Sequence, residues 1–216
     1  MEPSVIAGVV LAGGKSSRMG GTDKCLAAIA GRGLLERVVE RVRPQVSRLA
    51  INANGDISRF DRFGLPVIAD RIGGLAGPLA GLHAALEWAK ALGQGSHVVT
   101  MACDTPFLPH VLVERFVGAL AVTSGDCCVA RSAKGVHPVT GLWPVSMADE
   151  LATELALDHR KASVWAERQK VVEVFFPAIE IGGREVDPFF NINRPEDLAE
   201  ADALLAQGAK LTGRSG

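Results

Sequence analysis

The stretch VVLAGGKSSRMGGTDK, residues 9–24, decides the fold, because a short apolar run passes directly into a loop with four glycines and three basic residues. Glycines let backbone N–H groups approach a ligand, and the carboxyl end of a strand is where open α/β sheets bind ligands. Successive amides attract anions, and Lys15 and Arg18 add positive charge. The stretch therefore predicts a phosphate-binding loop. Taken alone, it is also compatible with a glycine-rich turn whose basic residues are solvated.

Two familiar phosphate-binding motifs do not match this loop. A Walker A motif has the pattern G-x-x-x-x-G-K-[ST], whereas five residues separate Gly8 from Gly14, and the sequence contains no G-x-G-x-x-G. The loop is thus neither a P-loop nor a dinucleotide fingerprint.

The order of apolar segments predicts an α/β fold with a mostly parallel sheet covered by helices on both faces. We expect one domain over residues 1–210 and a flexible tail over 211–216. Runs rich in Val and Ile predict eight strands in one sheet, over residues 5–11, 49–52, 66–68, 97–101, 127–130, 139–142, 171–176 and 189–191. Apolar stripes predict helices that contain residues 35–42, 79–86, 113–120 and 198–205, the last of them with Pro195 at its first position.

The composition indicates a small-molecule partner. The chain has 216 residues, is 48% hydrophobic and carries a net charge of −1 with scattered basic residues, so we expect no nucleic acid or membrane partner. Its four cysteines form no CxxC pair, which argues against structural zinc and a disulfide scaffold and favours a reducing cytoplasm. The N-terminus lacks the basic start of a signal peptide. We therefore expect a cytoplasmic location.

A carboxylate follows the predicted strand over 97–101. In VVTMACDTPFLP, residues 98–109, Asp104 stands at the carboxyl end of the strand, on the same sheet edge as the glycine-rich loop. Mg²⁺ takes one or two protein carboxylates and completes its shell with phosphate oxygens and waters. Asp104 is therefore a candidate metal ligand, although Asp-Thr-Pro is also a common turn and helix start. Strand alternation points Cys103 to the opposite face, as a buried thiol.

Polar residues follow other strands as well. Asn52 and Asp70 are placed to bind a base or ribose edge, whereas Asn54, beside Gly55, is better explained by turn chemistry. Asn191 and Asn193 stand near the C-terminus, where they would either contact substrate or cap the last helix.

Taken together, the segments LAGGKSSRMGGTDK, NAN, GPLAGL, CDTPF and NINRPEDL resemble the molybdenum cofactor guanylyltransferases. The resemblance covers most of the chain in order, but residues 131–188 match weakly and Arg194 stands where relatives often have Thr. It implies a three-layer α/β/α Rossmann-like nucleotidyltransferase that is monomeric. Such an enzyme uses GTP and Mg²⁺, joins GMP to the terminal phosphate of molybdopterin or its metal-loaded form, and releases pyrophosphate. Transient protein partners would deliver and receive the cofactor.

The resemblance also implies roles for individual residues. Asp104 would hold the metal, and Asn191 and Asn193 match a region on the pterin side, to which we add His137 as a possible substrate contact. The residues expected to contact GTP are Leu11, Ala12, Gly13, Lys24, Asn52, Asp70 and Asp104.

The chemistry of nucleotidyl transfer agrees with these roles, because it depends on in-line positioning and charge neutralisation more than on a protein nucleophile. We expect Lys15, Arg18, Lys24 and Asp104 to be catalytic, with Lys24 at the α-phosphate or the incoming phosphate and the Gly13 and Gly14 amides at the leaving pyrophosphate. One alternative is a CTP-dependent molybdopterin cytidylyltransferase of the same fold or another small-molecule nucleotidyltransferase. A second alternative is a nucleotide-binding sensor without activity.

Overall fold

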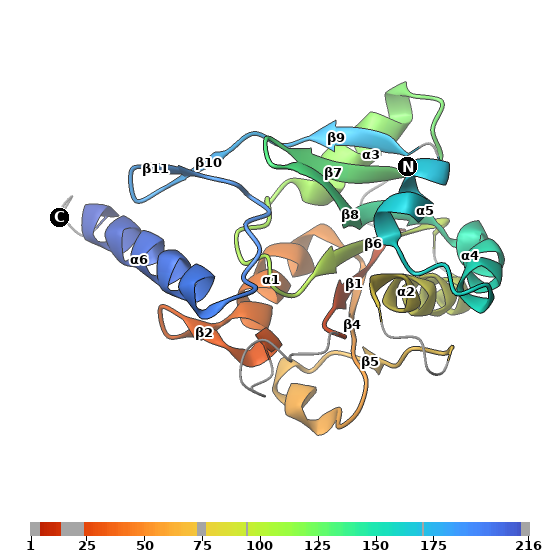
Figure 1. Ribbon diagram of the computed structural model, residues 1–216, viewed down its shortest axis with the longest axis horizontal. Coiled ribbons are helices and arrows are strands. Elements are labelled where there is room, and N and C mark those ends of the chain that lie inside the picture. Colours follow the sequence, from red (N-terminus) through yellow and green to blue (C-terminus); the bar gives the residue numbers. More distant parts are fainter. Residues whose placement is uncertain (1–4, 14–23, 73–76, 94, 170, 213–216) are drawn as a thin grey trace.

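The computed structural model describes residues 5–13, 24–72, 77–93, 95–169 and 171–212, with side chains described as far as Gly208. Seven strands form the central sheet in the order β5-β4-β1-β6-β8-β7-β9 (Figure 1). They are β1 (Ala7–Leu11), β4 (Arg48–Asn52), β5 (Val67–Ile68), β6 (His97–Ala102), β7 (Cys128–Ser132), β8 (Gly135–Pro144) and β9 (Val172–Phe175). The predicted α/β class with a mostly parallel sheet is confirmed.

The strand β8 is antiparallel to both of its neighbours, whereas the other pairs in the sheet are parallel. Because β8 is antiparallel to both β6 and β7, the strands β6 and β7 run in the same direction. The carboxyl ends of β1, β4, β6 and β7 therefore share one edge with the start of β8. Side chains that follow these strands are brought together by topology, whatever their separation in sequence.

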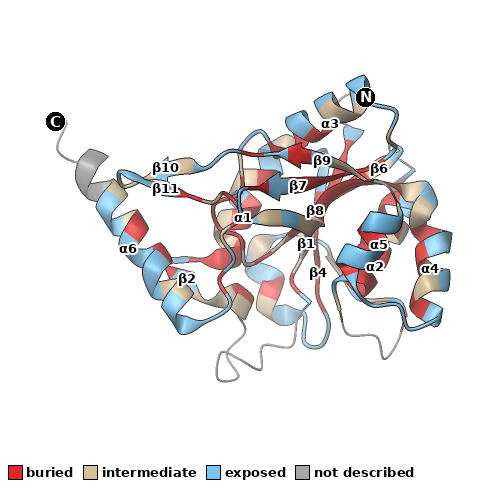
Figure 2. Cartoon of the chain, turned by 45° about the horizontal axis from the view of Figure 1, so that its top comes forward, coloured by how far each residue is buried: buried red, intermediate tan, exposed pale blue. Residues whose placement is uncertain are grey.

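Helices cover both faces of the sheet, because successive side chains of its strands point to opposite sides. In β1, Val10 packs into a core with α1 (Leu34–Val42) and α3 (Leu112–Val122). Val9 packs into a second core with α2 (Pro78–Leu92), α4 (Ala148–Ala156) and α5 (Ala162–Arg168). The burial of the strands and of the inward helix faces is visible in Figure 2. These are the three layers that the resemblance implies.

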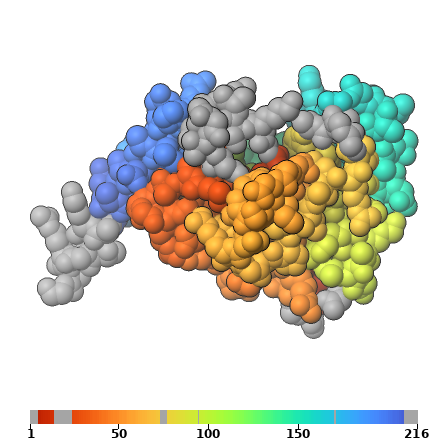
Figure 3. Space-filling model, turned by 90° about the horizontal axis from the view of Figure 1, so that it is seen from below, coloured from red at the N-terminus to blue at the C-terminus, as the bar shows by residue number. Residues whose placement is uncertain are grey.

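A smaller apolar cluster joins segments from both ends of the chain. It packs α6 (Pro195–Thr212) against two hairpins, β2 (Ala28–Ile29) with β3 (Arg32–Gly33) and β10 (Ile179–Ile181) with β11 (Arg184–Val186). Figure 3 shows α6 in blue beside the red-orange segment that contains β2. Short 3-10 helices complete the described chain: η2 (Lys24–Leu26), η3 (Arg43–Gln45), η4 (Ser58–Phe63) and η5 (Val145–Met147).

One predicted strand is wrong, and several elements were not predicted. Residues 189–191 begin with two phenylalanines, which favour a strand, but they lie in a turn and an irregular segment outside the sheet. The Phe189 N–H donates to the Asp187 carboxylate at 2.7 Å, and the Ile192 N–H donates to the Asp104 carbonyl at 3.0 Å. These donors are therefore unavailable for a sheet ladder. The sequence analysis also missed α4, α5 and both hairpins.

The predicted start of the last helix is confirmed. The helix α6 begins at Pro195, which needs no hydrogen bond at its missing N–H. Asp197, in its first turn, accepts from the backbone N–H groups of Asn193 at 2.7 Å and Arg194 at 2.8 Å. Because Asp197 satisfies these donors, the helix fixes the backbone of the segment that precedes it.

The approach of α2 to the sheet depends on Gly81. A Cβ atom at this position would lie 2.5 Å from Asn52 Oδ1, so an alanine requires the helix or the buried amide to move. We expect Gly81→Ala to lower the free energy of unfolding by about 1–3 kcal/mol, the usual cost of overpacking, in urea titrations. Gly118→Ala, in α3, is the matched control, because its Cβ would meet nothing within 4 Å, and it should stabilise the protein by up to about 1 kcal/mol. Equal stability of the two variants would contradict this account.

Candidate active site

An ion pair between Lys24 and Asp104 is at the centre of the site. Lys24 begins η2 and Asp104 follows β6, and the Lys24 Nζ atom lies 2.5 Å from Asp104 Oδ2. The ammonium also donates to Asn193 Oδ1 at 2.6 Å and lies 3.5 Å from Asn191 Oδ1. Both charged side chains are 16% exposed. Three segments far apart in sequence thus converge on one ammonium group.

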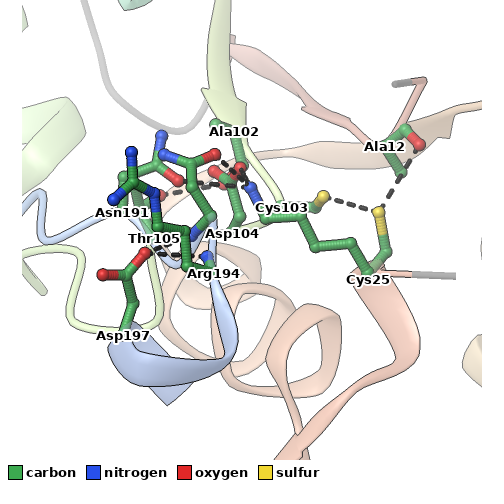
Figure 4. A network of polar contacts seen from close by, with 11 residues as sticks. Ala12, Cys25, Ala102, Cys103, Asp104, Thr105, Asn191, Arg194 and Asp197 are labelled. Atoms are coloured by element: carbon green, nitrogen blue, oxygen red, sulfur yellow. Dashed lines mark hydrogen bonds and ion pairs between the residues drawn. The ribbon is translucent and has the colours of Figure 1, made fainter. Parts of the chain in front are cut away.

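The backbone around Asp104 explains why Asn191 and Asn193 both reach Lys24. The Ile192 N–H donates to the Asp104 carbonyl, which places the segment 191–193 beside the turn after β6. The two asparagines flank Ile192 in the sequence, and both reach Lys24 while Ile192 is buried in the small cluster. Figure 4 shows Asn191, Arg194 and Asp197 gathered beside Asp104. Both asparagines contact Lys24, the lysine that is predicted to bind phosphate. The start of α6 is capped by Asp197 and by neither asparagine.

The second oxygen of the Asp104 carboxylate suits a cation. Asp104 Oδ1 is buried and has no hydrogen-bond partner within the described part of the chain. A buried carboxylate oxygen without a partner is unfavourable, and a hard divalent cation satisfies it. Among the described residues no group of three or more His, Cys, Asp and Glu side chains could hold a metal. Asp104 therefore fits a site of the magnesium type, in which substrate phosphate and water complete the shell.

A second polar network fixes Asp70 at the ends of β4 and β5. Asn52, which is 1% exposed, donates to Asp70 Oδ1 at 2.9 Å and to the Ile68 carbonyl at 3.1 Å. Asn54 donates to Asp70 Oδ2 at 2.8 Å, and the Asp70 N–H donates back to Asn54 Oδ1 at 2.9 Å. Asn54 is thus a positioning residue and not simply a turn residue. The sequence feature that could have indicated this role is the position of Asn54 two residues after Asn52.

The backbone of the glycine-rich loop begins between these two networks. The Ala12 N–H donates to the Asn52 carbonyl at 2.8 Å, and the Cys103 N–H donates to the Leu11 carbonyl at 3.1 Å. A Cβ atom at Gly13 would lie 3.4 Å from Asn52 Oδ1, so the chain runs close to the buried amide. Leu11, Ala12 and Gly13 therefore lie at the same sheet edge as Asn52 and Asp104, and their contact with a nucleotide stays a prediction. Gly14, Lys15 and Arg18 lie outside the described residues.

A third cluster lies at the same sheet edge, beyond β8. Ser132, at the end of β7, donates its hydroxyl to Asp187 Oδ2 at 2.6 Å, and His137 Nε2 lies 2.9 Å from Ser132 Oγ. Because the single hydroxyl proton goes to Asp187, His137 carries its proton on Nε2 and donates to Ser132. The His137 ring stacks on Phe189 with centroids 4.5 Å apart. Of these residues, the sequence analysis singled out only His137.

The environment keeps the His137 ring neutral near neutral pH. Burial lowers the pKa of His137, and the Asp187 carboxylate opposes that shift without cancelling it. In the neutral ring, the Nδ1 atom is then a hydrogen-bond acceptor. Asp187 precedes Asn191 by four residues, so the two Cα atoms are at most about 14 Å apart. The cluster is therefore within the reach of a small molecule bound at Lys24.

The Cys103 thiol is buried, as predicted, and points away from the charged pair. Cys103 is 5% exposed, and its hydrogen bond with the Cys25 thiol, together with burial, raises its pKa. Its Sγ atom lies 2.6 Å from that of Cys25, and the two thiols meet on the side of Cys103 away from the Asp104 carboxylate (Figure 4).

Comparison with known proteins gives consistent results. Residues 8–172 match the model of the MobA-like NTP transferase domain. The chain is 49% identical to the molybdenum cofactor guanylyltransferase of Mesorhizobium japonicum over 93% of its length and 96% of that protein. It is 43% identical to the enzyme of the same name from a Bradyrhizobium species, over 94% of each chain.

A solved structure supports the same relationship. The molybdopterin-guanine dinucleotide biosynthesis protein A of Archaeoglobus fulgidus superposes with a TM-score of 0.70 at 25% identity, over 94% of this chain and 100% of that one. Along the described chain, no helix has both the length and the hydropathy to cross a membrane.

The Asn54–Asp70 pair gives a prediction for nucleotide binding. Removal of a hydrogen bond to a charged group costs about 1.5–3 kcal/mol, so Asn54→Ala should weaken GTP binding at least tenfold in calorimetry. Asp56→Ala is the control, because the Asp56 carboxylate accepts only from the nearby Ser58 among the described residues, and its affinity should equal that of the unchanged protein. Equal losses in both variants would indicate a general effect of the loop.

Proposed function

Because the chain belongs to the family of MobA-like NTP transferases, we propose that it transfers GMP from GTP to the terminal phosphate of molybdopterin and releases pyrophosphate. The relatives from Mesorhizobium japonicum and Bradyrhizobium are named molybdenum cofactor guanylyltransferases and match nearly the whole chain. The observation that carries the proposal is the convergence of Lys24, Asp104 and Asn193 at the sheet edge where a nucleotide is expected.

In the proposed reaction, an oxygen of the acceptor phosphate attacks the α-phosphorus of GTP. A new P–O bond forms, and the bond from the α-phosphorus to the oxygen that bridges the α- and β-phosphates breaks, so pyrophosphate leaves with that electron pair. The acceptor phosphate carries about 1.5 to 2 negative charges near neutral pH and needs no general base. Lys24 neutralises the charge that redistributes over the phosphate oxygens.

Asp104 would hold a divalent cation in this site, and we propose Mg²⁺. When bound, the ion supplies positive charge to the phosphate oxygens. The cation would lie at Asp104 Oδ1, and Lys24 would turn from Oδ2 toward phosphate when substrate binds. The observed ion pair is thus the resting arrangement, in which each group neutralises the other.

The nucleotide itself would contact Leu11, Ala12 and Gly13 through backbone groups. Asn52 fixes the Asp70 carboxylate, and a carboxylate offers about four lone-pair sites, so Asp70 keeps acceptor capacity toward N–H or O–H groups of a guanosine. Lys15 and Arg18 belong to the same proposal through their place in the glycine-rich loop.

Substitution of the central pair tests the proposal directly. We expect Lys24→Ala to lower kcat for molybdopterin-dependent pyrophosphate release by about 100-fold or more, because the stabilisation it supplies is greatest in the transition state. Asp104→Asn should abolish the divalent-metal dependence of the remaining turnover. Calorimetry with GTP, CTP and ATP accompanies the assay. Retained turnover in both variants would contradict the proposed site, and a preference for CTP would move the assignment to a cytidylyltransferase.

The cluster of Ser132, His137 and Asp187 is proposed to bind the far end of the acceptor, with Asn191 and Asn193 nearer the reacting phosphate. A stacked ring, a neutral imidazole and a carboxylate suit a flat heterocycle with several hydrogen-bonding groups, as in a pterin. The position supports this role, because the segment 187–193 runs from the cluster to Lys24.

We expect Asp187→Asn to raise the KM for molybdopterin about tenfold and to leave the Kd for GTP unchanged, since the substitution removes an acceptor from Ser132. Glu185→Gln, at an exposed position two residues earlier, is the control and should change neither constant. A loss of GTP affinity in Asp187→Asn would show that the cluster supports the nucleotide side of the site instead.

A further inference from the structure

Two buried thiols meet beside the residues of the ion pair, and the proposed nucleotidyl transfer makes no use of them. Cys25 and Cys103 are each 5% exposed, and their Sγ atoms lie 2.6 Å apart. Each is the sequence neighbour of one charged partner, Lys24 or Asp104. The thiol pair and the ion pair therefore connect the same two segments, η2 and the turn after β6, in adjacent positions.

The surrounding backbone keeps the two sulfur atoms together. The Cys103 N–H donates to the Leu11 carbonyl, and the Cys25 thiol donates to the Ala12 carbonyl at 3.5 Å, so both cysteines are attached to the end of β1. The other two cysteines differ in this respect. Cys127 and Cys128 are neighbours in sequence but belong to the cores on opposite faces of the sheet. Apposition of thiols is thus specific to Cys25 and Cys103 among the four.

We propose that Cys25 and Cys103 are a site of reversible oxidation, at which a disulfide holds Lys24 against Asp104 and stops nucleotidyl transfer. The regulatory part rests on the proposed assignment of Lys24 and Asp104 to the transfer site. The oxidant is a small two-electron acceptor of the hydroperoxide class, since the buried sulfur atoms admit only small reagents.

The step balances with hydrogen peroxide. One thiol attacks the O–O bond and becomes a sulfenic acid with release of water, and the second thiol then displaces a second water to form the S–S bond. Two thiols are thereby oxidised by two electrons, and one peroxide is reduced to two waters. A dithiol reductant reverses the step by exchange.

The effect on the site follows from the constraint. A disulfide limits the distance between its two Cα atoms to about 4.4–6.8 Å and fixes their relative orientation. In the proposed transfer, the neighbouring Lys24 leaves Asp104 Oδ2 for phosphate. A covalent bond between the adjacent residues opposes this movement. We expect the oxidised protein to have at least tenfold lower kcat.

The experiment treats the full chain with hydrogen peroxide, alkylates the remaining thiols and maps the peptides by mass spectrometry. We expect the peptides of Cys25 and Cys103 to be recovered linked, and turnover to fall and to return with dithiothreitol. Cys25→Ala should keep its turnover under the same treatment. Cys103→Ala should do the same, and it replaces Cys25→Ala if that variant does not fold. Cys127→Ala is the matched control and should remain as sensitive as the unchanged protein.

Two results would overturn the proposal. Recovery of Cys25 and Cys103 as separately alkylated peptides would show that no disulfide forms. A linked pair with unchanged turnover would show that the bond does not regulate transfer. Lys24→Ala, assayed in parallel, separates this failure from that of the proposed function, because retained turnover in Lys24→Ala would indicate that the site itself is misassigned, whereas the peptide map is independent of activity.

Discussion

The bond between Lys24 and Asp104 is the constraint on which the rest of the site depends. Taking an ion pair out of water is unfavourable unless further hydrogen bonds compensate. Here the Lys24 ammonium donates one such bond to Asn193 Oδ1. The pair joins η2, the end of β6 and the segment before α6, which no short-range interaction would bring together. Such a pair is weak evidence for stability. It is better explained as two charges held ready for a ligand that brings its own phosphates and cation.

The sheet makes this arrangement possible, because its strands deliver polar groups to one edge at fixed spacing. Adjacent positions on β1, β4 and β6 receive the loop at Ala12, the amide of Asn52 and the carboxylate of Asp104. Gly81 then allows α2 to lie against Asn52 without displacing it.

The sequence was sufficient for the parts of the site that depend on strand ends. Asp104, Asn52 and Asp70 each follow an apolar run, so their place at the edge could be predicted. The hydrogen bond between Ser132 and Asp187 could not be predicted, because it joins residues 55 positions apart in the sequence. It also depends on the hairpin of β7 and β8 and on a turn that the sequence predicts as a strand. Asn54 was misread for a related reason: a turn residue and a residue that orients a carboxylate have the same sequence signature.

The segment 187–193 connects the cluster of Ser132 and His137 with the ion pair of Lys24 and Asp104. One end is bonded to Ser132 and stacked on His137, and the other reaches Lys24, while the Ile192 N–H attaches its middle to the Asp104 carbonyl. Asp197 fixes its last residues from the first turn of α6. Because this segment is bonded at both ends and in the middle, a movement that breaks one of these contacts also disturbs the others. In the proposed assignment, an acceptor lying along this segment would have its phosphate at Lys24 and its far end at the cluster of Ser132, His137 and Asp187.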